Sequence, residues 1–144
     1  MKRVFSILLA VVLINQSVLF GENVAASKPQ KTDYARAYYF HGDFRCSNCY
    51  KIEKYSKEAI DKYFAKELAS GELEYKVVNV DEKDNEHFAK DYKLYTKSLV
   101  ISKIKGGEEV EYKNLEKVWN YLGDKEAFYN YVKEEAAKFL EGNK

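Results

Sequence analysis

Two cysteines, Cys46 and Cys49, are the residues of this 144-residue chain whose type and spacing best suit chemistry. They are the only cysteines in the sequence, and Ser47 and Asn48 separate them. A disulfide between them would close a very short loop, which stabilises a fold little because it barely constrains the unfolded chain. The spacing therefore indicates redox chemistry more than structural cross-linking.

The pair lies between a predicted strand, residues 35–40, and a predicted helix, residues 46–69. The helical segment has apolar residues at steps of three and four, whereas the strand is aromatic and nearly uncharged. Helical rise brings α-carbons three residues apart to roughly 5 Å, which a disulfide requires. Free N–H groups and the helix dipole favour a thiolate on Cys46. We therefore expect Cys46 to attack and Cys49 to resolve the mixed disulfide.

Two residues near the pair are candidates for auxiliary roles. Arg45 would either add positive potential beside Cys46 or lie solvated, and both interpretations stay open. His41 would reach the sulfur region across the loop, although a lone histidine at a strand end is more often a packing or hydrogen-bonding residue. His87 is predicted to be exposed on the second helix, and Trp119 is predicted to lie in the core.

Residues 1–26 follow the order of a secretory signal peptide. Lys2 and Arg3 precede an apolar run over residues 4–14, and small residues up to Ala26 supply a cleavage site. The run is too short to span a bilayer core of roughly 30 Å as a helix. We therefore expect cleavage after Ala26 and a periplasmic or secreted protein. The alternative is an uncleaved N-terminal membrane anchor.

After the leader we expect a flexible lead-in, residues 27–33, and one domain over residues 34–141. The remaining chain, of roughly 118 residues, is large enough to close one core without a metal. The full chain has a net charge of +1, and removing residues 1–26 leaves equal numbers of basic and acidic side chains. A nucleic-acid-binding face would need a basic excess, so nucleic acid is excluded as a partner. The mature form is not expected to be embedded in a membrane.

The element order predicts an α/β fold. Beyond the first strand and helix we expect strands at 73–80, 98–104 and 109–112, a short helix at 81–92, and a closing helix interrupted near Gly123 and capped by Asp124. The order β-α-β-α-β-β-α predicts a four-stranded mixed sheet flanked by helices on both faces. Helical connections between the first three strands predict that these strands are parallel. Gly106-Gly107 predicts a hairpin that adds an antiparallel edge strand.

With these elements in place, the chain resembles the thioredoxin superfamily over most of residues 34–141. The resemblance lies in the Cys-x-x-Cys pair between strand and helix, and in the segments Tyr38-Tyr39-Phe40, Val78-Asn79-Val80-Asp81, Phe88-Ala89-Lys90-Asp91-Tyr92 and Ser98-Leu99-Val100-Ile101. It implies a thioredoxin-like fold and exchange of disulfides with proteins.

A narrower group is also similar to this chain. The small exported thioredoxin-like proteins catalogued as nitrophenyl-compound nitroreductase subunits share the pattern of Tyr39-Phe40-His41-Gly42, Arg45-Cys46 and Lys51-Ile52-Glu53-Lys54.

Four positions depart from the pattern that the resemblance implies. Lys97 stands in place of the cis-proline that docks the substrate backbone and keeps metals from the sulfurs. Arg45 replaces a tryptophan, and Lys54 replaces a proline that kinks the helix. Phe40 stands in place of the buried acid that assists the resolving cysteine. The fold is still implied, whereas efficient general reductase activity is not.

The leading hypothesis is an exported thiol–disulfide oxidoreductase without a bound cofactor. It would exchange electrons with protein thiols and disulfides or with a membrane reductase. A second hypothesis is soft-metal or metalloid binding through Cys46, Cys49 and His41, since thiolates select soft ions, whereas structural zinc would need a fourth ligand. A third is a non-enzymatic docking subunit in which the cysteine pair is a static clip. The absence of a glycine-rich phosphate loop argues against a flavin enzyme.

Overall fold

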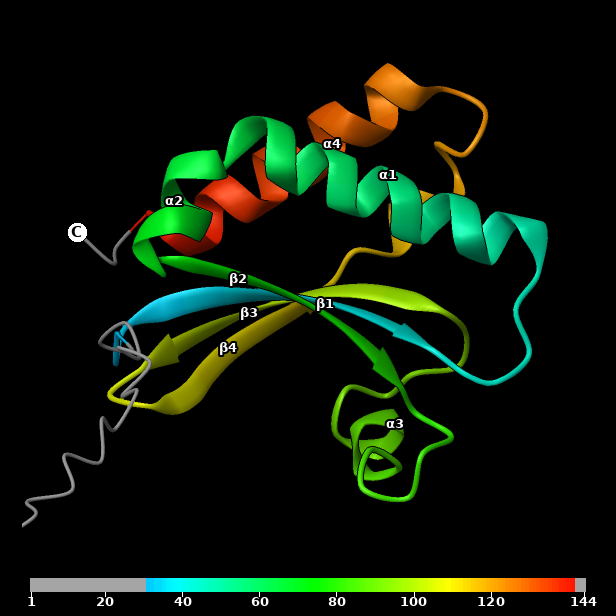
Figure 1. Ribbon diagram of the computed structural model, residues 1–144, viewed down its shortest axis with the longest axis horizontal. Coiled ribbons are helices and arrows are strands. Elements are labelled where there is room, and N and C mark those ends of the chain that lie inside the picture. The colour runs from blue at the N-terminus through cyan, green and yellow to red at the C-terminus, as the bar shows by residue number, and fades with distance from the viewer. Residues whose placement is uncertain (1–30, 142–144) are drawn as a thin grey trace, which may run out of the picture.

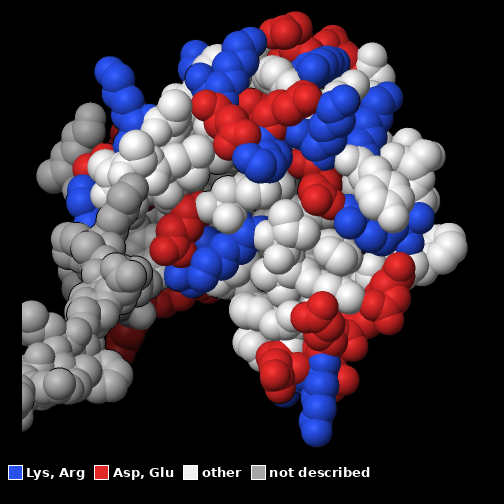
Figure 2. All heavy atoms as spheres, viewed as in Figure 1, with Lys and Arg blue, Asp and Glu red and all other residues white. Residues whose placement is uncertain are grey.

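The computed structural model describes residues 31–141 (Figure 1). The predicted signal peptide, residues 1–26, lies outside the described residues, as does most of the predicted lead-in. Lys31, near the end of that lead-in, pairs with Glu72 at 2.6 Å between Nζ and Oε1. Within residues 31–141, no helix combines the length and the apolar character needed to cross a membrane. Figure 2 shows basic and acidic side chains interspersed over the face viewed.

The predicted order of strands and helices is confirmed, with one helix divided in two. The elements are β1 Tyr34–His41, α1 Ser47–Tyr63, α2 Ala65–Ser70, β2 Leu73–Asn79, α3 His87–Asp91, β3 Ser98–Lys105, β4 Glu108–Asn114, the 3-10 helix η1 Glu116–Trp119 and α4 Lys125–Leu140. The predicted first helix breaks at Phe64, whose backbone leaves helical geometry (φ −128°, ψ 29°). The Phe64 ring is buried in the core, and α2 continues in a new direction after it (Figure 1). The cap predicted for the closing helix is present, since Asp124 Oδ1 accepts the Ala127 N–H at 3.0 Å.

The sheet has the strand order β2-β1-β3-β4. β1 and β2 are parallel, whereas β3 is antiparallel to β1 and forms a hairpin with β4. The hairpin turns at Gly106 and Gly107, both with positive φ, as their spacing predicts. The prediction that β3 runs parallel to the first two strands is wrong. Helix α3 has five residues and is about 8 Å long, which is too short to return the chain along a seven-residue strand, so β3 starts at the end where β2 stops.

The two faces of the sheet carry separate apolar clusters. Alternate residues of β1, such as Ala37 and Tyr39, face the main core under α1 and α4. The residues between them, Tyr38 and Phe40, face the other side and pack with Tyr92 at α3. Figure 1 shows α1, α2 and α4 on one side of the sheet and α3 on the other. The period-two alternation of β1 therefore decides which side chains lie beneath the start of α1.

Candidate functional site

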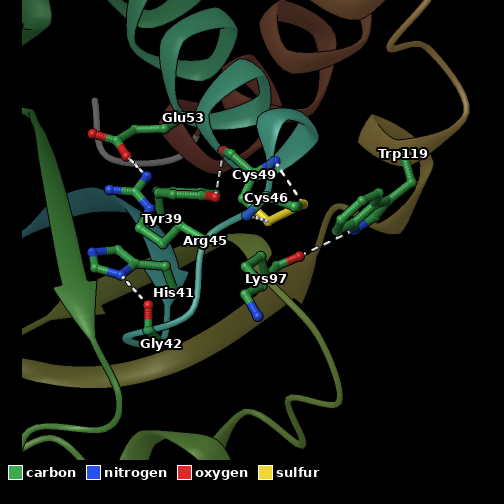
Figure 3. Close-up of a disulfide and its surroundings, with 9 residues drawn as sticks. All are labelled: Tyr39, His41, Gly42, Arg45, Cys46, Cys49, Glu53, Lys97 and Trp119. Atoms are coloured by element: carbon green, nitrogen blue, oxygen red, sulfur yellow. Dashed lines mark hydrogen bonds and ion pairs between the residues drawn. A yellow bond between two sulfur atoms is a disulfide. The ribbon is translucent and has the colours of Figure 1, made fainter.

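The two cysteines form a disulfide at the start of α1, with α-carbons 5.1 Å apart. Cys46 is the N-cap residue of this helix, with extended backbone angles (φ −90°, ψ 168°), and Cys49 is the third helical residue. The Cys49 N–H donates to Cys46 Sγ at 3.3 Å, and the Cys46 N–H donates to Cys49 Sγ at 3.1 Å (Figure 3). The sulfur atoms thus satisfy N–H groups at the helix start that have no carbonyl partner within the helix.

The two sulfurs differ in their access to solvent. Cys49 is only 2% exposed, whereas Cys46 is half-buried. A neighbouring molecule can therefore approach Cys46 more readily than Cys49. The N–H beside Cys46 Sγ and the helix dipole favour negative charge on this sulfur. The arrangement suits a first cysteine that meets a partner and a second that acts from within the fold.

Tyr39 lies directly beneath the helix start, and sequence reasoning did not single it out. Its side chain is fully buried, and its hydroxyl donates to the Cys49 carbonyl at 2.6 Å (Figure 3). Burial raises the pKa of Tyr39 to about 12, although the nearby Arg45 charge acts to lower it. The resemblance placed Phe40 at the position of a buried acid near the resolving cysteine. This assignment is corrected, because Phe40 faces the opposite side of the sheet.

The alternative in which Arg45 lies solvated is wrong, and the added positive potential beside Cys46 stays a prediction, because the Arg45 charge is paired. Its guanidinium forms an ion pair with Glu53, and its side chain is 16% exposed. The guanidinium carbon also lies 4.2 Å from the ring centre of Tyr50 and 5.8 Å from that of Tyr39. Burial opposes the charge of Arg45, but the hydrogen bond and charge of Glu53 raise its pKa overall. Glu53 therefore compensates the positive potential that Arg45 would add beside the disulfide.

His41 turns toward its own loop. Its Nδ1 lies 3.0 Å from the Gly42 carbonyl oxygen, and its ring centre lies 6.1 Å from that of Tyr39 (Figure 3). Across residues 31–141, no three His, Cys, Asp or Glu side chains come together as a metal-binding group. The predicted metal hypothesis thus lacks a third ligand here. His87 is exposed and contacts Asp91 at 2.8 Å, in agreement with its predicted place on the surface.

The prediction that Trp119 lies in the core is confirmed in part. Trp119 is half-buried and packs against the main core, and its indole Nε1 donates to the Lys97 carbonyl at 3.0 Å. In Figure 3, Trp119 lies on the side of the disulfide away from Arg45, and Lys97 lies below the disulfide. The Lys97 ammonium lies 5.9 Å from the ring centre of Phe44. A contact between η1 and the segment before β3 has no signal in local sequence, because it joins residues more than twenty positions apart.

Exposed aromatic residues lie around the site, with Tyr50 on the side of Arg45 and Phe44 beside Lys97. Phe44 is 79% exposed and Tyr95 is 95% exposed, and Tyr50 is also exposed. A hollow of about 240 Å³ borders Tyr95 and is lined by Tyr95, Thr96, Ser98, Asn114, Leu115, Glu116, Val118 and Trp119. Large apolar side chains left in solvent around a concave surface are typical of a place where another molecule binds.

The four-stranded mixed sheet flanked by helices, with the cysteine pair between its strand β1 and helix α1, is the architecture that the sequence resemblance implies. The fold is thioredoxin-like. No protein-family model matches the chain, and a search of curated proteins finds no match.

Solved structures of thioredoxins are similar to it at low identity. The thioredoxin of Fasciola hepatica is 23% identical over 74% of this chain and 81% of that chain, with a TM-score of 0.45. The reduced thioredoxin pre-protein of Schistosoma mansoni is 23% identical over 76% of this chain and 83% of that chain, with a TM-score of 0.44. Oxidised thioredoxin O2 of Arabidopsis thaliana is 18% identical over 67% of this chain and 76% of that chain, with a TM-score of 0.40.

Proposed function

We propose that this protein is an exported thiol–disulfide oxidoreductase that exchanges disulfides with a protein partner. The observation that supports this function best is the unequal burial of Cys46 and Cys49 at the start of α1. A purely structural disulfide would need no accessible sulfur. Disulfide exchange needs one sulfur that the partner can reach and one that is buried. A thioredoxin-like fold that carries a Cys-x-x-Cys pair supports thiol–disulfide chemistry in general.

The proposed reaction passes two electrons through the cysteine pair. In the reduced protein, the Cys46 thiolate attacks one sulfur of a partner disulfide, and the other partner sulfur leaves as a thiolate. Cys49 then loses its proton and attacks Cys46 Sγ. This step forms the Cys46–Cys49 disulfide and releases the second partner thiolate. The partner has gained two electrons and the protein has lost two, and the oxidised protein runs the same steps in reverse.

The surroundings of the disulfide favour a macromolecular partner. Phe44, Tyr50 and Tyr95 expose aromatic area that a small thiol would not cover. Aromatic residues are enriched where proteins bind one another. We therefore propose that the partner is a protein that carries thiols or a disulfide, or a membrane reductase that docks here.

Export is proposed on the sequence of residues 1–26 alone. The periplasm or the medium would keep the pair in contact with oxidised partners, because disulfides form and persist in such compartments. A mature N-terminus at Ser27 in the purified protein would support cleavage, whereas an intact Met1 would favour the membrane-anchor alternative. The narrower resemblance to nitrophenyl-compound nitroreductase subunits remains a prediction.

The experiment that tests the function is a measurement of the reduction potential. The protein is equilibrated in glutathione or dithiothreitol buffers, and its free thiols are trapped and counted by mass. We expect a reversible two-electron transition between about −270 and about −120 mV. A potential below about −300 mV would make the disulfide structural. Unchanged biological function in a Cys46→Ser/Cys49→Ser double variant would instead favour the docking-subunit alternative.

A further inference from the structure

The outer edge of β2 carries backbone groups that no described strand occupies. The Ala35 N–H donates to the Glu72 carbonyl at 2.8 Å, and the Val80 N–H donates to the His41 carbonyl at 2.8 Å, so even-numbered residues of this segment face β1. Backbone groups alternate in direction along a strand. The groups that point away from β1 therefore belong to Leu73, Tyr75, Val77 and Asn79, and the Asn79 carbonyl already accepts a hydrogen bond from Asn85 Nδ2 at 3.0 Å. Among residues 31–141, β2 pairs with β1 alone.

A hollow of about 470 Å³ follows this edge. Its lining includes Leu68 and Gly71 from the region of α2, and Leu73, Glu74, Tyr75 and Lys76 from β2. In Figure 1, β2 lies on the viewer's side with no helix or strand in front of it. Val77 is 44% exposed although it is a strand residue with an apolar side chain. Over residues 73–77 the edge thus has outward-facing backbone groups without a described strand partner, and the hollow beside residues 73–76 leaves space for another extended strand.

We propose that β2 pairs with β2 of a second copy of this chain, antiparallel, with Tyr75 of one copy opposite Tyr75 of the other. In this register Glu74 lies opposite Lys76 of the second copy, and Leu73 lies opposite Val77 of the second copy. The two-fold symmetry repeats each pair. Opposite charges and apolar pairs placed directly across two strands stabilise the pairing.

The charges on β2 also exclude the neighbouring registers. If each strand shifts by one residue in one direction, Lys76 comes to lie opposite Lys76 of the second copy. If each strand shifts by one residue in the other direction, Glu74 comes to lie opposite Glu74 of the second copy. Like charges directly across two strands are destabilising. Glu74 is already held in place by Arg36, at 2.7 Å between Nε and Oε2. The strand therefore specifies one register for pairing with itself.

The other edge of the sheet, strand β4, carries charged residues that are mainly acidic and disfavour pairing with a second copy. β4 places Glu108, Glu109 and Glu111 close together on an exposed strand. Two such strands would bring carboxylates together, and charged edge residues of this kind keep edges apart. Self-pairing through β4 is therefore disfavoured, and the two edges of one sheet differ in whether they allow a second copy to bind.

The test is the concentration dependence of the molecular mass, measured by sedimentation velocity on the purified protein as it is recovered from cells. We expect a reversible monomer–dimer equilibrium. Lys76→Glu is expected to weaken it by roughly tenfold, because each symmetric pair changes from attraction to repulsion. The double variant Glu74→Lys/Lys76→Glu restores the opposite charges and should recover much of the dimer. Lys83→Glu, the same charge change on an exposed loop, should leave the equilibrium unchanged.

Two outcomes would overturn the proposal. A monomer at every accessible concentration would do so, as would a dimer that Lys76→Glu leaves intact. Hydrogen exchange of the Tyr75 and Val77 amides supplies a second measurement, since dimerisation should slow both. Slow exchange of these amides in a monomer would mean that residues before Lys31 cover the edge. Circular dichroism of each variant separates loss of the dimer from loss of the fold.

Discussion

The two sides of the Cys46–Cys49 disulfide differ in almost every physical respect. On one side, Tyr39, Arg45 and Glu53 form a closed set of polar contacts under the first turn of α1. On the other side, Tyr95 and Trp119 border an open hollow of apolar character. The closed side touches the backbone of the buried cysteine, whereas the open side lies where a partner would approach the half-buried one.

This difference separates two tasks that a disulfide-exchange protein must perform. The closed side holds fixed charges and a hydrogen bond next to the helix start, so it affects the relative stability of the dithiol and disulfide forms. The open side offers exposed aromatic area, so it affects how strongly a partner binds. Substitutions on the two sides should consequently change different measured quantities, and the following expectations test that separation in order of decreasing effect.

Loss of the accessible sulfur should abolish the chemistry on which both sides depend. Cys46→Ser is expected to remove exchange with a peptide disulfide completely, because no thiolate remains to attack. Cys49→Ser is the matched control, since it should still attack but remain as a mixed disulfide with the peptide. Mass spectrometry of the non-reduced protein distinguishes the two. An unchanged exchange rate in Cys46→Ser would contradict the assignment of the attacking residue.

A change on the open side should affect binding alone. Trp119→Ala is expected to raise the KM for a peptide disulfide by about tenfold, in the range of a moderately important contact residue. The reduction potential should stay that of the unmodified protein. Val110→Ala is a matched control, because Val110 is an exposed apolar residue on β4 away from this hollow. A shifted potential with an unchanged KM in Trp119→Ala would mean that the open side sets the chemistry instead.

A change on the closed side should affect stability and its pH dependence. Tyr39→Phe is expected to lower the free energy of unfolding by about 1 kcal/mol, since it removes one buried hydrogen bond. The pKa of Tyr39 is raised to about 12 from 10.0, so the protonated phenol stabilises the fold fully below pH 10. That contribution to the free energy of unfolding is lost as the pH rises through about 12. Tyr39→Phe has no phenol to ionise, so its stability should fall less between about pH 10 and about pH 12.

Urea unfolding at neutral and alkaline pH measures both effects. Tyr75→Phe serves as the comparison, because its hydroxyl makes only a long contact of 3.4 Å with the Glu53 carbonyl. Equal losses in the two variants at neutral pH would show that the contact with Cys49 contributes nothing of its own.

The smallest expected effect comes from breaking the ion pair between Arg45 and Glu53. Glu53→Gln leaves the Arg45 charge uncompensated near the helix start, which favours the thiolate form. We expect the reduction potential to rise by about 6–20 mV, since about 30 mV corresponds to 1.4 kcal/mol and a charge at a helix end contributes about 0.3–1 kcal/mol. Asp61→Asn removes an equal charge at the far end of α1, where Asp61 pairs with Lys57. Equal shifts in both variants would contradict a local effect of Glu53.

Local features of the fold could be predicted from the sequence because they depend on residues close together in the chain. The Cys-x-x-Cys spacing, the Asp124 cap and the Gly106-Gly107 turn each arise within a few positions. The direction of β3 could not be predicted in the same way. It depends on whether a segment such as α3 is long enough to cross the sheet, and sequence patterns place helix ends only within a few residues.

The sequence by itself determined that two cysteines lie one helical turn apart at the junction of a strand and a helix. Only the tertiary structure decided what surrounds them. A shift of one residue along β1 exchanges Tyr39 and Phe40 between opposite faces of the sheet. The pairing of Arg45 with Glu53 and the contact of Trp119 with Lys97 depend on packing between elements. The spacing of the two cysteines sets their geometry, because helical geometry is local. The contacts around them form only when the folded chain brings distant residues together.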